Sequence, residues 1–334
     1  MCLPGVSLRL SITQTREVRT MLKPADKSHS AMQQDAQSCL GGSAGLAQKI
    51  AKWSMNNNIH NTKISGLTLY QWDAPTEKTS YLLQPSICLI GQGRKRVILG
   101  DGIHEYDADH FLITSVELPV VSHVIEASSE KPFMGLTLDL DLRTIAQMIL
   151  NADIPVMPAP RDRLSISVSR VSESLLDAFL RLLKLLETPE DIPVLAPLIK
   201  QEIAYRLLTG EQGPRLRQIT TVENHSYQIA RAIDWMKNNF QKSIRVEELA
   251  GIAGLSTSAF HNHFRLMTAM TPIQYQKRMR LNEARQLMLT AHMDASSAAF
   301  EVGYESPSQF SREYSRYFGA PPARDIKTLI DVSS

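Results

Sequence analysis

The 334-residue sequence has few of the features that mark a secreted, metal-stapled or membrane protein. Its three cysteines, Cys2, Cys39 and Cys88, are an odd number without a Cys-x-x-Cys pair, which excludes a disulfide framework and a zinc ribbon. A reducing, cytoplasmic setting fits this best. No apolar run approaches the roughly 18 residues that a membrane span needs, and the N-terminus has no signal-peptide core. A soluble protein is therefore expected.

An excess of charge of one sign is also missing, since 36 Lys and Arg oppose 34 Asp and Glu in a formal net charge of +2. Nucleic-acid-binding proteins usually carry more positive charge, so the whole-chain balance gives no sign of such a partner. The balance is uneven, however. Residues 225–334 contain thirteen basic and ten acidic residues, which makes this part +3 and leaves −1 for the rest. Within it, residues 265–285 hold five basic residues against Glu283 alone, a density that suits phosphate contacts.

The length predicts two domains, and the first is rich in β-strand signals. Short runs of Val, Ile, Leu, Thr and Tyr, separated by Gly, Asp and Pro, predict an antiparallel sandwich or small barrel between Ile64 and Leu138. Hairpin turns are expected at Gly91–Gly93 and Gly100–Gly102. Examples of such runs are Ile64–Trp72, Ser86–Ile90, Arg96–Leu99, Phe111–Ser115, Val120–Ile125 and Phe133–Leu138.

Helical periodicity follows the strands and resumes after a Pro-rich connection at residues 155–160. Two amphipathic helices are predicted, with apolar stripes over residues 171–186 and 195–207. Each stripe must be buried, either against the strands or in a dimer contact, and the pattern leaves both alternatives open. The segment Gly210–Asn224 has little periodicity and is the expected interdomain linker.

One arrangement occurs twice in the C-terminal third: two short helices joined by a tight turn that contains glycine. The first unit spans residues 246–267 and turns at Gly254, and the second spans residues 294–318 and turns at Gly303, 49 residues later. Such a pair is a helix-turn-helix, and two in-phase copies are stronger evidence than one. The caps expected at the helix starts are Ser256, Thr271 with Pro272, Asp294, and Ser306 with Pro307.

A continuous helix predicted at Pro272–Leu289 would join the two units. At 1.5 Å per residue its length is about 27 Å. With helix widths added, it would hold two recognition helices near the roughly 34 Å that separates successive major-groove faces on one side of B-DNA. One chain is therefore expected to contact two adjacent half-sites.

The second helix of each unit has one apolar and one polar face. Leu255, Phe260 and Phe264 are expected to pack inward in the first unit, and Phe310, Tyr314 and Phe318 in the second. Asn and Gln side chains pair with adenine edges, Arg with guanine and Ser with either, so the outward residues suit a DNA groove. An ordinary solvated helix face is the alternative, which the duplication disfavours. The predicted base-facing residues are Ser258, His261, Asn262, Arg265, Ser308, Gln309, Arg312 and Arg316, and the predicted phosphate contacts are Lys277, Arg278 and Arg280.

These helical segments carry a family signature. The stretches Ala298–Tyr304, Ser306–Arg312 and Phe318–Pro322 closely resemble the C-terminal signature of AraC/XylS-type transcription regulators, and the resemblance spans roughly Ser226–Thr328. It implies that the two units contact neighbouring major grooves, with Ser258, His261, Asn262, Ser308, Gln309 and Arg312 at base-facing positions. In place of the Tyr-Arg often found after the final Pro, this chain has Asp325-Ile326.

The N-terminal part resembles one family of AraC-type N-terminal domains, through Tyr81–Ser86, Gln92–Arg96, Tyr205–Gly210 and Pro214–Gln218. This resemblance implies a cupin-like β-barrel with a helical appendage that senses a small molecule and dimerises. The expected fold is thus a multidomain α+β chain with an all-α, double helix-turn-helix C-terminal domain. The expected boundaries are 1–50 for a disordered extension, 51–210 for the sensing domain, 211–224 for the linker and 225–334 for the DNA-binding domain.

Enzymatic chemistry has little support in the sequence. His104, His110 and His123 lie in the β region with Glu105 and Glu117 nearby, but they lack the His-x-His and Glu spacing of a barrel metal site. Gly91-Gln92-Gly93 lacks the third glycine of a dinucleotide site, and no Walker or Gly-x-Ser-x-Gly motif is present. No catalytic residue, metal or cofactor is therefore expected. Cys88 is expected to be buried and inert, with reaction toward an electrophilic effector as the alternative.

These observations predict a cytoplasmic, sequence-specific transcription regulator that responds to a small molecule. The expected partners are double-stranded promoter or operator DNA, a small-molecule effector, RNA polymerase and a second copy of the chain, without a membrane. The alternatives are a cupin-type enzyme or ligand-binding protein with a helical scaffold, and an architectural DNA-binding protein. The identity of the effector, the operator sequence and the sign of regulation are left open by these residues.

Overall fold

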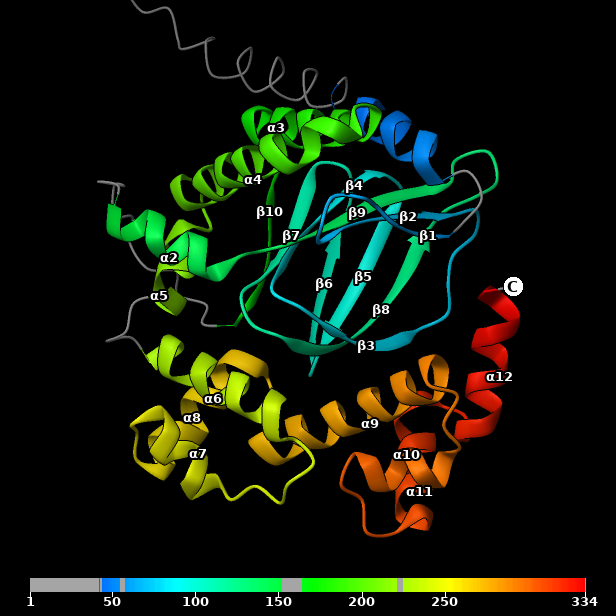
Figure 1. Ribbon diagram of the computed structural model, residues 1–334, viewed down its shortest axis with the longest axis vertical. Helices are drawn as coiled ribbons and strands as arrows, with labels where there is room; N and C mark the ends of the chain where they lie inside the picture. Colours follow the sequence, from blue (N-terminus) through cyan, green and yellow to red (C-terminus); the bar gives the residue numbers. More distant parts are fainter. Residues whose placement is uncertain (1–41, 43, 55–57, 152–163, 221–224, 334) are drawn as a thin grey trace, which may run out of the picture. The chain divides into compact units, whose positions relative to one another are not determined.

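The computed structural model describes residues 42, 44–54, 58–151, 164–220 and 225–333 (Figure 1). We call residues 44–220 the β domain and residues 225–333 the helical domain. In the part of the chain so described, no helix is long and apolar enough to cross a membrane. The predicted Pro-rich connection and residues 1–41 of the predicted extension lie outside the described residues.

Two antiparallel sheets form the centre of the β domain. The six-stranded sheet has the order β1-β2-β9-β4-β7-β10, and the four-stranded sheet has the order β3-β8-β5-β6. The sheets do not join into one closed barrel, although β6 lies beside β7 and β10 at one edge. This open, cupin-like sandwich confirms the predicted β architecture. The strands are β1 Ile59–Asn61, β2 Leu67–Trp72, β3 Thr79–Leu83, β4 Ser86–Gln92, β5 Arg94–Leu99, β6 Gly102–Tyr106, β7 His110–Thr114, β8 Leu118–Glu126, β9 Phe133–Asp139 and β10 Ile166–Arg170.

Of the two predicted hairpin turns, the structure contains one and lacks the other. Gly100–Gly102 does join β5 to β6, where Leu99 pairs with Gly102. The prediction for Gly91–Gly93 was wrong, because β4 pairs with β7 and β9 whereas β5 pairs with β8 and β6 in the other sheet. A short gap between two strands does not determine whether they pair, and here the chain crosses from one sheet to the other.

Helices cover the face of the six-stranded sheet that points away from the second sheet. Residues 44–54 are helical, and their Leu46 and Ile50 are fully buried. Residues 44–50, which were expected to belong to the extension, are therefore helical, because these apolar side chains have a core to pack against. Phe111 of β7 lines one pocket together with Leu175 and Leu207, which lie on the two longer helices. The helices after β9 are α2 Leu142–Asn151, α3 Glu173–Lys184, α4 Ile192–Thr209 and α5 Gly213–Thr220, with short 3-10 turns at Leu185–Glu187 and Pro189–Asp191.

The expected linker contains regular structure, since α5 occupies residues 213–220. Its Leu216 and Ile219 are buried, and Arg215 donates hydrogen bonds to the carbonyl oxygens of Leu164 and Ile166. These contacts tie α5 to the start of β10. Residues 221–224 lie outside the described part of the chain.

The helical domain contains two helix-turn-helix units at opposite ends of the long helix α9 (Figure 1). The first unit has a core that includes Phe260, Phe264 and Tyr275, and the second has a separate core around Phe310 and Tyr314. Each recognition helix is therefore held by its own aromatic cluster. The helices are α6 His225–Asn239, α7 Val246–Ala253, α8 Thr257–Thr268, α9 Pro272–Thr290, α10 Ala295–Glu301, α11 Pro307–Phe318 and α12 Pro322–Ser333.

Candidate nucleic-acid interface

The first helix-turn-helix unit follows directly from its local sequence. Helix α7 ends at Gly254, whose φ of 70° lies in the left-handed region that glycine adopts without strain. The Ser256 side chain then caps α8 by accepting a hydrogen bond from the Ala259 amide at 3.3 Å. Phe260 and Phe264 are fully buried, and Phe264 meets Tyr275 edge to face at 5.4 Å between ring centres. The aromatic stripe thus fixes which face of α8 points outward.

The outward face of α8 carries the four residues that were predicted to lie there. Ser258, His261, Asn262 and Arg265 are all exposed. They recur at three- and four-residue spacing on one side of the helix. The structure therefore brings together the first set of predicted base-facing side chains.

The second unit repeats this construction with different caps. Asp294 accepts amide hydrogen bonds from Ser296 and Ser297 at the start of α10, and Ser306 caps α11 through the Gln309 amide. Gly303 between them has a φ of 87°, and a Cβ there would collide with the Gln241 carbonyl. Glycine is thus required at this turn for conformation and for space.

The outward face of α11 carries the second set. Ser308, Gln309, Arg312 and Arg316 are exposed, whereas Phe310 and Tyr314 on the opposite side are fully buried. The caps and faces of both recognition helices agree with the sequence predictions.

Glu313, which no sequence pattern singles out, organises the side chains between α9 and α11. Its carboxylate accepts hydrogen bonds from Lys277 Nζ at 2.9 Å, Tyr304 Oη at 2.8 Å and Gln309 Nε2 at 3.3 Å. Partial burial raises the pKa of Glu313, but these three hydrogen bonds outweigh that effect and hold it below its usual value. Glu313 therefore positions Gln309, a predicted base-facing residue.

The three predicted phosphate contacts occupy different environments. Lys277 is exposed and pairs with Glu313, and Arg278 lies 5.6 Å from the ring centre of Tyr317. Arg280 is half-buried, and its guanidinium group bonds to main-chain oxygens of the protein. It donates hydrogen bonds of 2.7–2.9 Å to the carbonyl oxygens of Phe240, Gln241, Lys242 and Gly303. Its partners lie far from it in sequence, so the local charge count could not reveal this structural role.

Direct contacts join the helical domain to the β domain. Tyr275 Oη donates a 2.6 Å hydrogen bond to the main-chain oxygen of Glu117, and Lys237 Nζ lies 2.6 Å from the Glu117 carboxylate. The Glu117 side chain is only 5% exposed, so this ion pair is shielded from water on its acidic side. Arg285 also donates to the Ser80 carbonyl at 3.2 Å. The strands β3 and β8 and the segment before β8 thus contact α6 and α9.

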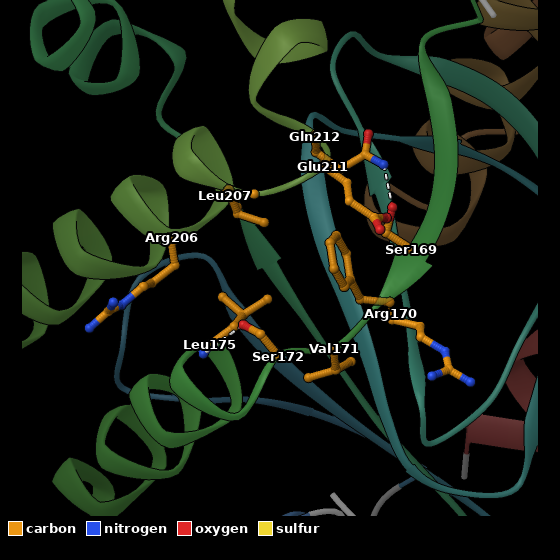
Figure 2. A pocket seen from close by; sticks show the side chains of 11 residues that line it. Ser169, Arg170, Val171, Ser172, Leu175, Arg206, Leu207, Glu211 and Gln212 are labelled. Carbon is orange, nitrogen blue, oxygen red and sulfur yellow. Dashed lines mark hydrogen bonds between the residues drawn. The ribbon is translucent and has the colours of Figure 1, made fainter. Parts of the chain in front are cut away.

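A surface pocket of about 250 Å³ lies between β10 and the ends of α3 and α4 (Figure 2). Its floor is apolar, with Phe111, Val171 and Leu175, and Gln212 donates a hydrogen bond to Ser169 at its rim. The charged ends of Arg170 and Arg206 point away from the other lining side chains (Figure 2). The pocket therefore offers apolar contact and few convergent polar groups.

Two side chains that were considered as metal ligands, those of His110 and Glu117, have other partners. His110 Nδ1 lies 2.8 Å from Asp107 Oδ1, and Glu117 pairs with Lys237. Among the residues that the structure describes, no three His, Cys, Asp or Glu side chains are grouped as metal ligands would be. Cys88 is 5% exposed, which confirms its predicted burial.

Two families match successive parts of the chain. AraC-type transcriptional regulator N-termini match residues 63–215, and a helix-turn-helix domain family matches residues 249–327. The chain belongs to the AraC-type transcriptional regulators. It is accordingly a DNA-binding regulator whose helix-turn-helix domain contains both units described above.

Two relatives of this AraC-type regulator match it at 24% and 35% identity. The transcriptional activator RhaS of Enterobacter sp. (strain 638) is 24% identical over 239 residues, which cover 70% of this chain and 84% of the relative. The probable transcriptional regulator LumQ of Photobacterium leiognathi is 35% identical over 91 residues, or 27% of this chain and 37% of the relative. The match to RhaS is thus longer than the match to LumQ but lower in identity.

The same two-domain fold occurs in ToxT of Vibrio cholerae. The structure of ToxT with a bound unsaturated fatty acid, from strain SCE256, has a TM-score of 0.55 at 12% identity and covers 78% of this chain and 94% of ToxT. The structure of ToxT from strain O395 with a naphthalenyl butenoic acid has a TM-score of 0.56, also at 12% identity, and covers 79% of this chain and all of ToxT. At this identity the likeness concerns the fold of the AraC-type regulator.

Proposed function

We propose that this regulator binds two adjacent major grooves of one duplex, with α8 in one and α11 in the other. The observation that carries the proposal is the pair of exposed polar faces, Ser258 to Arg265 and Ser308 to Arg316, each backed by its own aromatic core. Asn, Gln, Ser and Arg are the side chains that pair with base edges. Lys277 and Arg278 would contact phosphates, whereas Arg280 would act by holding the fold together.

Selection from a random duplex library with the purified full chain tests this proposal. Two short conserved blocks should be enriched, with centres about 10–10.5 base pairs apart, because successive major grooves on one side of B-DNA have that spacing. Binding that depends on salt but enriches no motif would instead support architectural DNA binding.

A small-molecule effector is proposed to bind the β domain and alter DNA binding. ToxT, which shares the fold, has been crystallised with two organic acids. The contacts of Glu117 with Lys237 and Tyr275 would carry the signal, since they join the β domain to α6 and α9. The effector must bind the two arrangements of the domains with different affinity, because only differential affinity shifts a population.

A homodimer is proposed as the active assembly, with α4 at its interface. The predicted apolar stripe of α4 is only partly covered: Ile203 and Leu207 are buried, but Leu195 and Leu198 are 39% and 56% exposed. Val194 and Tyr205 add to this exposed apolar surface. Leu198→Glu should therefore shift the full chain toward monomer in sedimentation velocity, whereas a wild-type monomer would refute the proposal.

Activation of transcription through RNA polymerase is proposed because the RhaS relatives are named activators. The cytoplasm is the proposed compartment, since the DNA that the regulator would bind lies there. We propose no catalytic role, because the matched families and relatives are regulators of transcription.

A further inference from the structure

The inner faces of the two sheets enclose polar side chains that DNA binding does not use. Lys95 lies on β5 two residues before Val97, and Val97 and Leu99 are buried on the inner face of the strand. Because side chains alternate along a strand, Lys95 shares that inner face. Its Nζ lies 5.5 Å from the ring centre of Tyr70 on β2 and 5.8 Å from that of Tyr81 on β3. The ammonium group thus lies between rings from both sheets.

Hydroxyl and thiol groups surround this lysine. Tyr106, which is opposite Lys95 in the β5–β6 pair, is 3% exposed, and Cys88 on β4 is 5% exposed. Ser122 Oγ donates to Tyr81 Oη at 3.3 Å, and Thr137 Oγ1 donates to Cys88 Sγ at 3.4 Å. We call Lys95, Tyr70, Tyr81, Tyr106 and Cys88 the inner cluster. It offers several hydrogen-bond donors around one positive charge.

The neighbours of Lys95 have acidic partners that it lacks. Arg94 lies 3.6 Å from Glu126, and Arg96 lies 2.5 Å from Glu105. In the described part of the chain, no ion pair joins Lys95 to a carboxylate. Burial lowers the pKa of Lys95, but Tyr81, Cys88 and Tyr70, together with a hydrogen bond to Tyr81, raise it above its usual value. Lys95 therefore differs from the other two basic residues at this end of β5.

The tyrosines do not supply a negative charge. Burial raises the pKa of Tyr70 and raises that of Tyr106 well above its usual value, so both phenols stay protonated at neutral pH. The faces of Tyr70 and Tyr81 attract the ammonium group only through weaker cation–π interactions. Burying a positive charge away from water costs free energy unless a negative charge pairs with it. The inner cluster is therefore one negative charge short of neutrality.

We propose that Lys95, flanked by Tyr70 and Tyr81, binds the carboxylate of a small organic acid between the two sheets, and that this acid is the effector. The inference rests on the proposed effector response of the β domain and names its chemical class. Val97, Leu99 and Val120 on the inner face of the same sheet would contact an apolar body. The ligand is thus an amphipathic carboxylate, for which Lys95 provides the charge and the tyrosines provide hydroxyl donors.

The inner cluster is also connected to the helical domain. Tyr81 points between the sheets, and the preceding residue, Ser80, is bonded through its carbonyl to Arg285 of α9. A ligand that shifts Tyr81 would therefore move a direct contact of the DNA-binding domain. This gives the proposed site a short route to the recognition helices.

Isothermal titration calorimetry on the full chain tests the site with matched probes. We would titrate octanoate, benzoate and 3-phenylpropanoate, each beside the corresponding alcohol, into wild type, Lys95→Met and the control Lys78→Met, which replaces an exposed lysine just before β3. Wild type and Lys78→Met should bind at least one carboxylate more tightly than about 1 mM. Lys95→Met should bind it at least ~10-fold more weakly. Lys95→Arg should restore most of the lost affinity.

The outcomes separate this inference from the proposed function. If no carboxylate binds wild type, or if Lys95→Met binds it as tightly as wild type, the inference is wrong. Thermal unfolding of each variant checks that it is folded. DNA binding by ligand-free Lys95→Met should equal that of wild type. If wild type binds carboxylate but selects no DNA motif, the proposed function fails while the site stands.

Discussion

The guanidinium group of Arg285 on α9 forms two hydrogen bonds with the carboxylate of Asp325 on α12, at 2.8 and 2.7 Å. The two side chains are only 12% and 10% exposed. Tyr314 of α11 donates a further 2.7 Å hydrogen bond to the same carboxylate, and the Phe318 ring centre lies 4.3 Å from the guanidinium. This pair therefore ties α11 of the second unit to the flanking helices α9 and α12.

Removing one partner of this pair should destabilise the protein strongly. Asp325→Ala would leave the Arg285 charge buried without its partner, and a loss of about 3–5 kcal/mol in the free energy of unfolding is expected. Denaturant unfolding of the full chain measures it. Glu187→Ala, which breaks the exposed pair with Lys52, is the control and should leave the midpoint unchanged. An equal, small effect of both changes would show that the Arg285–Asp325 pair does not hold the second unit.

Arg280→Ala should lower the stability of the protein and leave the salt dependence of DNA binding unchanged. The four carbonyl oxygens that Arg280 bonds would lose their donor, so the free energy of unfolding should fall by at least about 2 kcal/mol, the contribution of a single hydrogen bond to a charged group. The slope of log K against log salt should be unchanged for the folded variant. A slope reduced by about 1 would instead indicate a phosphate contact.

Arg312→Ala and Arg278→Ala should have different effects on DNA binding. Loss of the exposed Arg312 on α11 should relax the preference at one base position at a cost of about 1–3 kcal/mol. Loss of Arg278 on α9 should weaken specific and random duplexes equally and reduce the salt slope by about 1. Fluorescence anisotropy with both kinds of duplex at several salt concentrations measures these effects. An equal loss on specific and random DNA for Arg312→Ala would refute its assignment to a base.

The parts of the fold that local chemistry determines were predictable. Gly254, Thr271 with Pro272, and Ser306 with Pro307 each act within one helix turn, and the boundaries of both units agree with the structure. Contacts between distant segments were not predictable. The crossing at Gly91–Gly93, the internal partners of Arg280 and the meeting of Lys95 with Tyr70 all depend on how separate strands and helices pack. The short strands β1 and β10 lie outside the predicted β region and were missed for the same reason.

The contribution of Glu313 to the stability of the protein should depend on pH. Because its folded-state pKa lies below the usual value of 4.5, its ionised form adds stability above that pH, which is lost as the pH falls through the folded-state pKa. The difference in unfolding free energy between wild type and Glu313→Gln should therefore shrink as the pH falls below about 4.5. Urea unfolding at a series of pH values measures this difference. Glu301→Gln, at an exposed position of α10, is the control.

A pH-independent difference between wild type and Glu313→Gln would contradict this account of Glu313. The same variant should also hold Gln309 and Lys277 less firmly, since both donate to one oxygen of the Glu313 carboxylate and an uncharged amide oxygen is a weaker acceptor. Altered base preference near α11 is thus expected at neutral pH, in the same anisotropy assay that is used for Arg312→Ala.

Footprinting of the full chain on a selected duplex tests most directly whether one chain reads two grooves. Wild type should protect two segments on one face of the DNA, about 10–10.5 base pairs apart. Arg265→Ala, on α8, should weaken protection of one segment, and Arg312→Ala, on α11, should weaken protection of the other. Protection of a single segment, or loss of the same segment in both variants, would contradict the account.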